Sequence, residues 1–224
     1  MCGRFNIIPD AQAWISATHV LRDAEVFLDL SPRYNVAPSQ DIPAIRVDSQ
    51  SRERQACLLH WGLIPSWARD KKIGNRMINA RAETVAEKPA FRAAFKRRRC
   101  LLPASGFYEW QRTNGKQPYN IRRADGRPLF FAGLWERWEG AEGEIESCTI
   151  IVTQANEAMT RVHDRMPVIL DEDRIDPWLD PAETEKARLA ELLQPYGGDL
   201  EIYPVSRAVN SPRNDGPDLI RSLA

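Results

Sequence analysis

Residues 99–112, RCLLPASGFYEWQR, begin a run of strand-forming sequence that continues through 116–138, KQPYNIRRADGRPLFFAGLWERW, and 147–154, SCTIIVTQ. Each stretch is rich in branched and aromatic residues, which pack well on a pleated surface. The dipeptides Asn114-Gly115 and Asp125-Gly126 interrupt the run, and such pairs favour tight turns between antiparallel strands. The middle of the chain is therefore predicted to be mostly antiparallel sheet.

Shorter elements are predicted on both sides of this run. Strands are expected at residues 2–7, 41–47, 55–64, 166–170 and 201–206, and helices at 11–30, 82–99, 155–162 and 181–193. Asp10 is the expected N-cap of the first helix, and Pro89 is expected to break or restart the second. This irregular alternation predicts one α+β domain over residues 1–224 rather than a regular βαβ winding.

The charge balance limits the kinds of partner. The 224 residues include 31 basic and 31 acidic side chains, so the formal net charge is zero. A protein that coats nucleic acid by bulk attraction is expected to be basic, so any nucleic-acid site here must be a local basic patch. The run Lys96-Arg97-Arg98-Arg99 is interpreted as a solvated helix end in preference to a DNA contact.

The cysteine pattern and the chain ends favour a soluble, cytoplasmic protein. Cys2, Cys57, Cys100 and Cys148 lie far apart, without the short spacing of a zinc knuckle or a redox pair. We therefore expect no metal and no disulfide scaffold. The first residues do not resemble a signal peptide, and no apolar run approaches the roughly 18 residues of a membrane span.

Cys2 can carry covalent chemistry once the initiator methionine Met1 is removed, which a small second residue permits. The new chain end would be a 1,2-aminothiol, with reference pKa values near ~8 for the amine and ~8.5 for the thiol. Such a group captures aldehydes, because the amine forms a Schiff base and the thiol then closes a five-membered ring. Position alone leaves an ordinary small residue at a frayed chain end as the default interpretation.

Three further side chains could take part in proton transfer or orientation. His163 lies at a predicted helix-to-strand junction and could shuttle protons, or it could simply bond a backbone carbonyl. Glu109 lies among aromatic residues that would raise a carboxyl pKa, but strand alternation could also turn it to solvent. Asn79 precedes a predicted helix, where an amide is usually a cap, although it can equally orient a reacting group.

Trp67 is the best candidate for stacking on a base. It lies in a polar loop beside two lysines and an arginine, and an aromatic side chain next to cations suits single-stranded nucleic acid. An equally good interpretation is that Trp67 covers the edge of the core.

Nine motifs, in order along nearly the whole chain, resemble those of the SRAP family, the SOS-response-associated peptidases that act as abasic-site sensors. They are MCGRF (1–5), RYNVAPSQ (33–40), WGLIPSW (61–67), INARAET (78–84), CLLPASGFYEW (100–110), FFAGLWE (130–136), TIIVTQAN (149–156), HDRMPVIL (163–170) and PVSRAVN (204–210). This resemblance, and not its position alone, overturns the default interpretation of Cys2.

The resemblance implies a fold, a partner and a chemistry. The fold is one of twisted antiparallel β-sheets in a barrel-like core with flanking helices, and the partner is abasic single-stranded DNA in a narrow, positively charged cleft. The protein is expected to act as a monomer without a cofactor. By resemblance, Cys2 is the nucleophile that forms a stable thiazolidine with the ring-opened abasic sugar. Asn79 then orients the reacting groups, Glu109 is the acid-base residue, and His163 assists ring opening.

The resemblance also implies a set of DNA contacts. They are Arg4, Asn35, Trp67, Arg81, Arg165 and, as a further phosphate contact, Arg207. Some relatives carry a second aromatic residue directly after the loop tryptophan, whereas this chain has Ala68, so its stacking platform is smaller. Two other functions use the same residues: a cysteine peptidase that cleaves its own leader, and a passive binder of single-stranded DNA.

Overall fold

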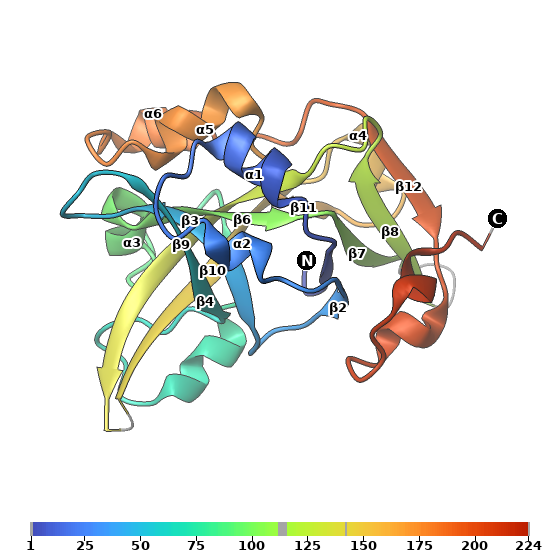
Figure 1. Cartoon of the computed structure of the whole chain (residues 1–224), viewed down its shortest axis with the longest axis horizontal. Coiled ribbons are helices and arrows are strands. Elements are labelled where there is room, and N and C mark those ends of the chain that lie inside the picture. Colours follow the sequence, from blue (N-terminus) through green and yellow to red (C-terminus); the bar gives the residue numbers. More distant parts are fainter. Residues whose placement is uncertain (1, 112–115, 142, 224) are drawn as a thin grey trace.

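The larger of two sheets closes on itself in the computed structural model, which describes residues 2–111, 116–141 and 143–223 (Figure 1). Its strands are β3 (Asp41–Val47), β4 (Arg54–Trp61), β6 (Arg99–Ala104), β9 (Leu129–Gly140) and β10 (Gly143–Gln154), with β5 (Asn79–Arg81) and β11 (Arg165–Pro167) beside β10. Because β10 pairs with both β9 and β4, the five longer strands form a closed barrel.

The second sheet is antiparallel throughout and has the order β12-β8-β7-β1-β2. Its strands are β1 (Phe5–Ile7), β2 (Arg33–Val36), β7 (Gly106–Gln111), β8 (Gln117–Arg123) and β12 (Leu200–Pro204). The expected α+β fold, with antiparallel sheets around a barrel-like core, is confirmed. Two parallel pairings, of β10 with β4 and with β5, were not predicted.

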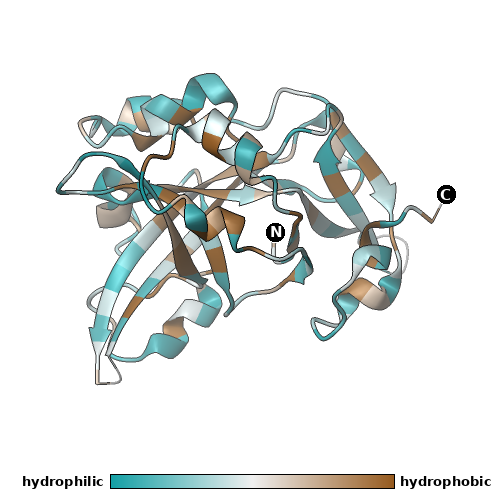
Figure 2. Cartoon of the chain, viewed as in Figure 1, coloured by the Kyte–Doolittle hydropathy of each residue, from teal (hydrophilic) through white to brown (hydrophobic). Residues whose placement is uncertain are grey.

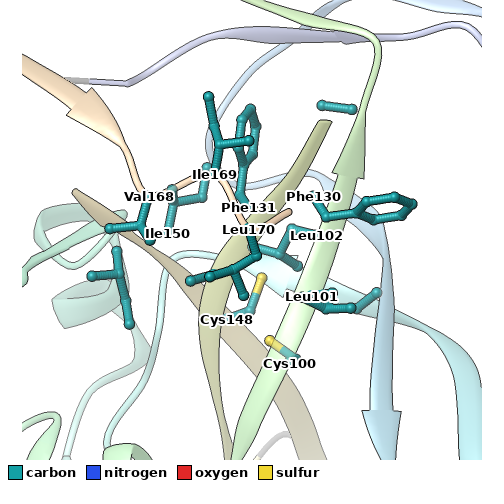
Figure 3. Packing of buried hydrophobic residues seen from close by; sticks show 14 of the residues in the cluster. Cys100, Leu101, Leu102, Phe130, Phe131, Cys148, Ile150, Val168, Ile169 and Leu170 are labelled. Carbon is teal, nitrogen blue, oxygen red and sulfur yellow. The ribbon is translucent and has the colours of Figure 1, made fainter. Parts of the chain in front are cut away.

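Aromatic rings join the barrel to the second sheet. Phe131 of β9 is fully buried and makes edge contacts with Phe5 of β1 and Phe107 of β7, each at a ring-centroid separation of 6.0 Å. Cys100 and Cys148 point into the same apolar interior (Figure 3). Hydrophobic residues lie along the barrel strands, whereas the upper helices in the view are mostly hydrophilic (Figure 2). The core therefore fixes β1, which follows Cys2, against the barrel.

The predicted helix over residues 11–30 is wrong, because the segment forms two short helices. They are α1 (Ala11–Thr18) and α2 (Glu25–Leu28). His19 and Asp23 have φ angles of 50° and 55°, so the backbone turns into the left-handed region and cannot continue a helix. The predicted N-cap is confirmed, since the Asp10 carboxylate accepts a hydrogen bond from the Ala13 amide.

The other helices are short and lie on the outside of the sheets. They are η1 (Lys71–Arg76), α3 (Arg92–Arg97), α4 (Glu157–Thr160), α5 (Glu172–Leu179), α6 (Lys186–Glu191), η2 (Arg207–Asn210) and η3 (Pro217–Ile220). The helices expected over 82–99 and 181–193 are thus reduced to α3 and α6. Helix α5 was not predicted because Pro177 lies inside it. No helix in the described ranges is long and apolar enough to span a membrane.

Arg99 is a buried structural residue, so the solvated interpretation of the basic run is wrong at this position. Its guanidinium donates to the backbone carbonyls of Phe95, Lys96, Trp178, Asp180 and Glu183. Burial lowers the pKa of the Arg99 guanidinium, and the charges of Asp180 and Glu183 oppose that effect. The interaction closes the end of α3 and joins it to the segment after α5.

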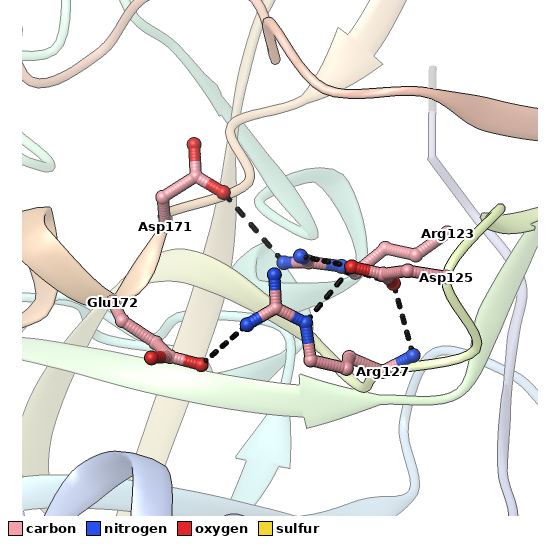
Figure 4. A network of polar contacts seen from close by, with 5 residues as sticks. All are labelled: Arg123, Asp125, Arg127, Asp171 and Glu172. Atoms are coloured by element: carbon pink, nitrogen blue, oxygen red, sulfur yellow. Dashed lines mark hydrogen bonds and ion pairs between the residues drawn. The ribbon is translucent and has the colours of Figure 1, made fainter.

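The predicted hairpin at Asp125-Gly126 is wrong, because the chain there crosses from one sheet to the other. Strand β8 belongs to the second sheet and β9 to the barrel. A network of arginines and carboxylates fixes the crossover (Figure 4). Hydrogen bonds, first of all from Arg123 and then from Arg127, hold the pKa of Asp125 well below its usual range. Arg127 also donates a hydrogen bond to Glu172 at the start of α5. The Asn114-Gly115 turn lies outside the described residues, although β7 and β8 on either side of it do pair antiparallel.

Candidate functional site

Cys2 is fully buried, three residues before the start of β1. Burial raises the pKa of its thiol, the negative charge of Glu109 raises it further, and a backbone hydrogen bond from Arg4 opposes the shift. The frayed chain end that position alone suggested is therefore wrong, because the residue is held in a dry environment. Its thiol is neutral near pH 7 rather than an activated thiolate.

Asn79 holds the backbone of Cys2. Its side-chain Nδ2 donates to the Cys2 carbonyl oxygen at 2.9 Å. The cap interpretation is wrong, because Asn79 lies on β5, where it pairs with Ile150 of β10. Its Oδ1 is buried and accepts no hydrogen bond from any described residue. A buried acceptor next to the future chain end is suited to receive an N–H or O–H donor.

Glu109 lies beside Cys2 and is only 2% exposed. Strands β1 and β7 pair so that Phe5 lies opposite Phe107, and the Tyr108 amide donates to the Arg4 carbonyl at 2.9 Å. The next pair in this register, beyond Arg4 and Tyr108, puts Glu109 opposite Gly3, the residue after Cys2. The solvent-facing alternative for Glu109 is therefore wrong.

His163 is buried in the segment between α4 and β11. Its Nδ1 lies 3.0 Å from the Arg165 amide, which donates to it, and 2.9 Å from a carboxylate oxygen of Asp164. Only a protonated Nδ1 could donate to Asp164, and that would exclude the bond from Arg165. We favour the backbone bond because Asp164 is largely exposed, so a neutral His163 carries its proton on Nε2.

Gln111 brings the segment of His163 to the same face of β7 as Glu109. The side chain of Gln111 donates to the Arg161 carbonyl at 2.8 Å, and residues two apart on a strand point to the same face. Asn79 and Glu109 thus each lie next to Cys2, and Gln111 ties the chain just before His163 to the strand that carries Glu109. No group of three or more potential metal ligands occurs among the described residues.

Half-buried Arg4 and buried Asn35 form one hydrogen-bonded unit. The Arg4 guanidinium donates to Asn35 Oδ1 at 2.7 Å and to the Val209 carbonyl at 2.9 Å. The Asn35 amide donates in turn to the carbonyls of Val209, Ser211 and Asn214. Burial lowers the pKa of Arg4. Because both polar ends of Asn35 are engaged within the protein, its geometry suits positioning of Arg4 better than direct contact with DNA.

Trp67 stands out from a well-anchored loop and is 59% exposed, so the core-edge interpretation is wrong. The indole N–H of Trp138 donates to the Ala68 carbonyl at 2.7 Å. At the base of the loop, Gly62 and Gly74 approach so closely that a Cβ on Gly62 would lie 2.8 Å from the Gly74 oxygen. The loop is therefore fixed to the rest of the protein, and it exposes a large aromatic surface to solvent.

The three remaining arginines differ in how freely they could meet a phosphate. Arg81 is exposed on β5 and lines a cavity of ≈ 330 Å³ together with Asn79. Arg165 forms an ion pair with Glu83. Arg207 is exposed at the start of η2, within the segment that Arg4 and Asn35 hold.

Sequence reasoning missed Arg76 and Lys88, which line the same cavity as Asn79 and Arg81. They lie in η1 and in the turns before α3, on either side of β5 in the chain. A larger cavity, of ≈ 610 Å³, lies elsewhere, along the start of α1 near Asn6 and Trp14. The cationic cavity is smaller, but its lining includes Asn79, which donates to the Cys2 carbonyl.

Comparison with known proteins matches almost the whole chain. The family model described as SOS response associated peptidase (SRAP) matches residues 1–212. The abasic site processing protein YoqW of Bacillus subtilis is 45% identical over 229 residues, covering 99% of this chain and 100% of its own. The abasic site processing protein HMCES of Xenopus tropicalis is 34% identical and covers 86% of this chain and 66% of its own.

Solved structures agree with the fold. A crystal structure of a protein from Bacteroides thetaiotaomicron matches with a TM-score of 0.84 and 27% identity, and the match covers 99% of each chain. One from Bordetella bronchiseptica matches with a TM-score of 0.76 at the same identity, over 92% of this chain and 100% of its own.

Proposed function

The chain belongs to the SRAP family, and from this premise we propose that it captures abasic sites in single-stranded DNA through a covalent bond to Cys2. The names of the relatives from Bacillus and Xenopus support abasic-site processing. The observation that carries the covalent step is the bond from Asn79 to the Cys2 carbonyl, beside the buried carboxyl group of Glu109. The active form would be a single domain that begins at Cys2 after Met1 is removed.

The proposed reaction has two bond-forming steps. The α-amine of Cys2 attacks the aldehyde carbon of the ring-opened sugar, and the carbinolamine loses water to give a Schiff base. The thiol then adds to the imine carbon while its proton passes to the nitrogen, which closes a thiazolidine. The net change is the loss of one water molecule, and no oxidant or metal is needed.

Each neighbouring side chain has a role that its position supports. Glu109 would accept a proton from the attacking amine and return it to the departing hydroxyl. Asn79 would hold the Cys2 backbone in the orientation that aims both nucleophiles at one carbon. Neutral His163, with its proton on Nε2, would donate to the ring oxygen of the closed sugar and so favour the open aldehyde.

The cationic cavity beside Asn79 supports the DNA-binding part of the proposal. Arg76, Arg81 and Lys88 line it, with Phe91 as an aromatic wall, and no carboxylate belongs to the described lining. Cations that follow a backbone are a usual component of a single-strand site, whereas Phe91 is buried in the core and closes the cavity from inside. In a chain of zero net charge, this is the local basic patch that such a function requires.

A cysteine peptidase is the second candidate, because the family description names one. Cysteine peptidases use a thiolate with a lowered pKa, whereas burial and Glu109 raise the pKa of the Cys2 thiol. The aldehyde reaction begins at the amine and does not need a thiolate in its first step. The electrostatics of Cys2 therefore favour abasic-site capture.

Intact-mass measurement after incubation with an abasic single-stranded oligonucleotide tests the proposal. We expect protein that begins at Cys2 and an adduct that survives heating without reductant. Cys2→Ser should give only a Schiff base that needs borohydride for trapping, because the amine remains and the thiol is lost. Cys57→Ser, on β4, serves as the matched control and should link normally. The same heat-stable adduct from Cys2→Ser would show that another residue is the nucleophile.

A further inference from the structure

We propose that Glu83 is a specificity-determining residue that weakens the binding of undamaged single-stranded DNA at the site of Cys2. The inference rests on the proposed function and adds to it a residue outside the predicted set. Glu83 forms an ion pair with Arg165, one of the predicted phosphate contacts. A phosphate that approaches Arg165 must therefore displace or share this carboxylate.

The sheet brings these two residues together. Val152 of β10 pairs with Arg81 of β5 on one side and with Pro167 of β11 on the other. The turn after β5, which carries Glu83, therefore comes close to the start of β11, which carries Arg165. Their side chains are 42% and 23% exposed, so both are accessible to a strand that passes over β10.

The distribution of charge around this pair is uneven. On one side lies the cavity of Arg76, Arg81 and Lys88, whose described lining holds no carboxylate. On the other lies a cavity of ≈ 460 Å³, and among the described residues that line it only Glu83 is charged. Arg81 and Thr84 line the first cavity, whereas Ala82 and Glu83, which lie between them in the chain, line the second. Glu83 thus places a negative charge where the cationic surface ends.

This placement affects damaged and undamaged strands differently. A phosphate held only by non-covalent contacts is repelled by a carboxylate a few ångströms away, and at a protein surface this repulsion changes affinity several-fold. An abasic strand is retained by its covalent bond once captured, so its retention does not depend on that affinity. Specificity is a difference between two affinities, and Glu83 increases this difference by penalising the undamaged strand.

Glu83→Gln tests the inference, because the amide keeps the shape of the side chain and removes its charge. By fluorescence anisotropy, the variant should bind an undamaged single-stranded oligonucleotide about three- to tenfold more tightly at low salt. The log–log salt slope should steepen by about 0.7, the value for one more phosphate contact on a single strand. The rate of linkage at saturating abasic oligonucleotide should stay within about twofold.

Glu201→Gln is the matched control, because Glu201 also forms an exposed ion pair, with Arg122, and lies on β12. It should change neither affinity nor salt slope. Weaker binding by Glu83→Gln would overturn the inference and show that Glu83 positions Arg165 for DNA. An unchanged affinity of Glu83→Gln for undamaged DNA would overturn it as well. So would the absence of binding to undamaged DNA by both the unaltered protein and Glu83→Gln. Failure of the proposed function would instead appear as no adduct from the unaltered protein with abasic DNA, independently of these affinities.

Discussion

The side-chain amide of Asn79 donates a hydrogen bond of 2.9 Å to the backbone carbonyl of Cys2. This bond connects β5 to a residue 77 positions earlier in the sequence. Asn79→Asp keeps the shape of the side chain but cannot donate this bond. We expect linkage to an abasic oligonucleotide to slow about fivefold, the equivalent of one hydrogen bond worth ~1 kcal/mol. Single-turnover rates at saturating DNA measure the effect, with urea unfolding to confirm the fold. An unchanged rate would remove Asn79 from the mechanism.

Glu109 should affect the thiol and the linkage reaction in opposite directions. Its charge raises the pKa of Cys2, so Glu109→Gln should lower that pKa and increase the thiolate fraction at any pH below it. Alkylation of Cys2 by iodoacetamide at pH 8 should therefore become faster, followed by peptide mass spectrometry. Linkage should become slower, by about 10²–10⁴-fold for a lost acid-base group. Slower alkylation together with slower linkage would indicate a damaged site rather than a lost proton carrier.

Asn35 should matter for stability through the segment that it holds. Asn35→Ala leaves the carbonyls of Val209, Ser211 and Asn214 without this donor, which should cost about 1–3 kcal/mol in the free energy of unfolding. Hydrogen exchange of residues 206–215 should increase at the same time. Asn35→Asp keeps the acceptor for Arg4 and loses the donor, so it should match Asn35→Ala in exchange. Protection equal to that of the unaltered protein would contradict this role.

The sequence was informative where structure is determined by neighbouring residues. The branched run at 41–47 forms β3 with the predicted bounds, and Asp10 caps α1 as expected. Local patterns fail where tertiary contacts decide. His19 takes a left-handed conformation, and Arg99 is stabilised in the interior by carbonyls from distant segments that its charge alone could not reveal.

The same distinction applies to the candidate site. The family resemblance, rather than the chemistry of the residue alone, led to the prediction that Cys2 is the nucleophile and that Asn79, Glu109 and His163 assist it. The environment could not be predicted, because it depends on the parallel pairing of β5 with β10, a non-local contact without a periodic signature. Lys88 was missed as well, because the sequence placed it inside the helix predicted over residues 82–99.

Affinity for single-stranded DNA should depend only moderately on salt. If about three or four phosphates are neutralised, the log–log slope should be about −2 to −3, since each contact contributes ~0.7 on a single strand. Lys88→Ala should reduce the slope by about one contact. Arg52→Gln, in the turn before β4 and at the opposite end of that strand from the Trp67 loop, should leave it unchanged. A much steeper log–log slope, which would mean that many counterions are released, would contradict a narrow local site. Tighter binding of duplex than of single-stranded DNA would contradict it too.

Trp67 should contribute to DNA binding and hardly at all to stability. Its side chain is 59% exposed, so Trp67→Ala should change the free energy of unfolding by less than about 0.5 kcal/mol. Loss of one stacked base costs about 1–3 kcal/mol, which corresponds to roughly 5- to 150-fold weaker binding of a single strand. Leu28→Ala removes a similarly exposed apolar side chain on α2 and should not alter binding.

The anchoring of the Trp67 loop gives a second, independent measurement. Trp138→Phe keeps an aromatic ring in place but removes the N–H that donates to the Ala68 carbonyl. The loop should then become more mobile, and DNA binding should weaken by less than it does in Trp67→Ala, because the stacking ring is still present. In the double variant, Trp138→Phe should add nothing to the loss of affinity, since its effect acts through Trp67. Additive losses, measured by anisotropy in the same buffer, would mean that Trp138 acts on DNA binding by another route.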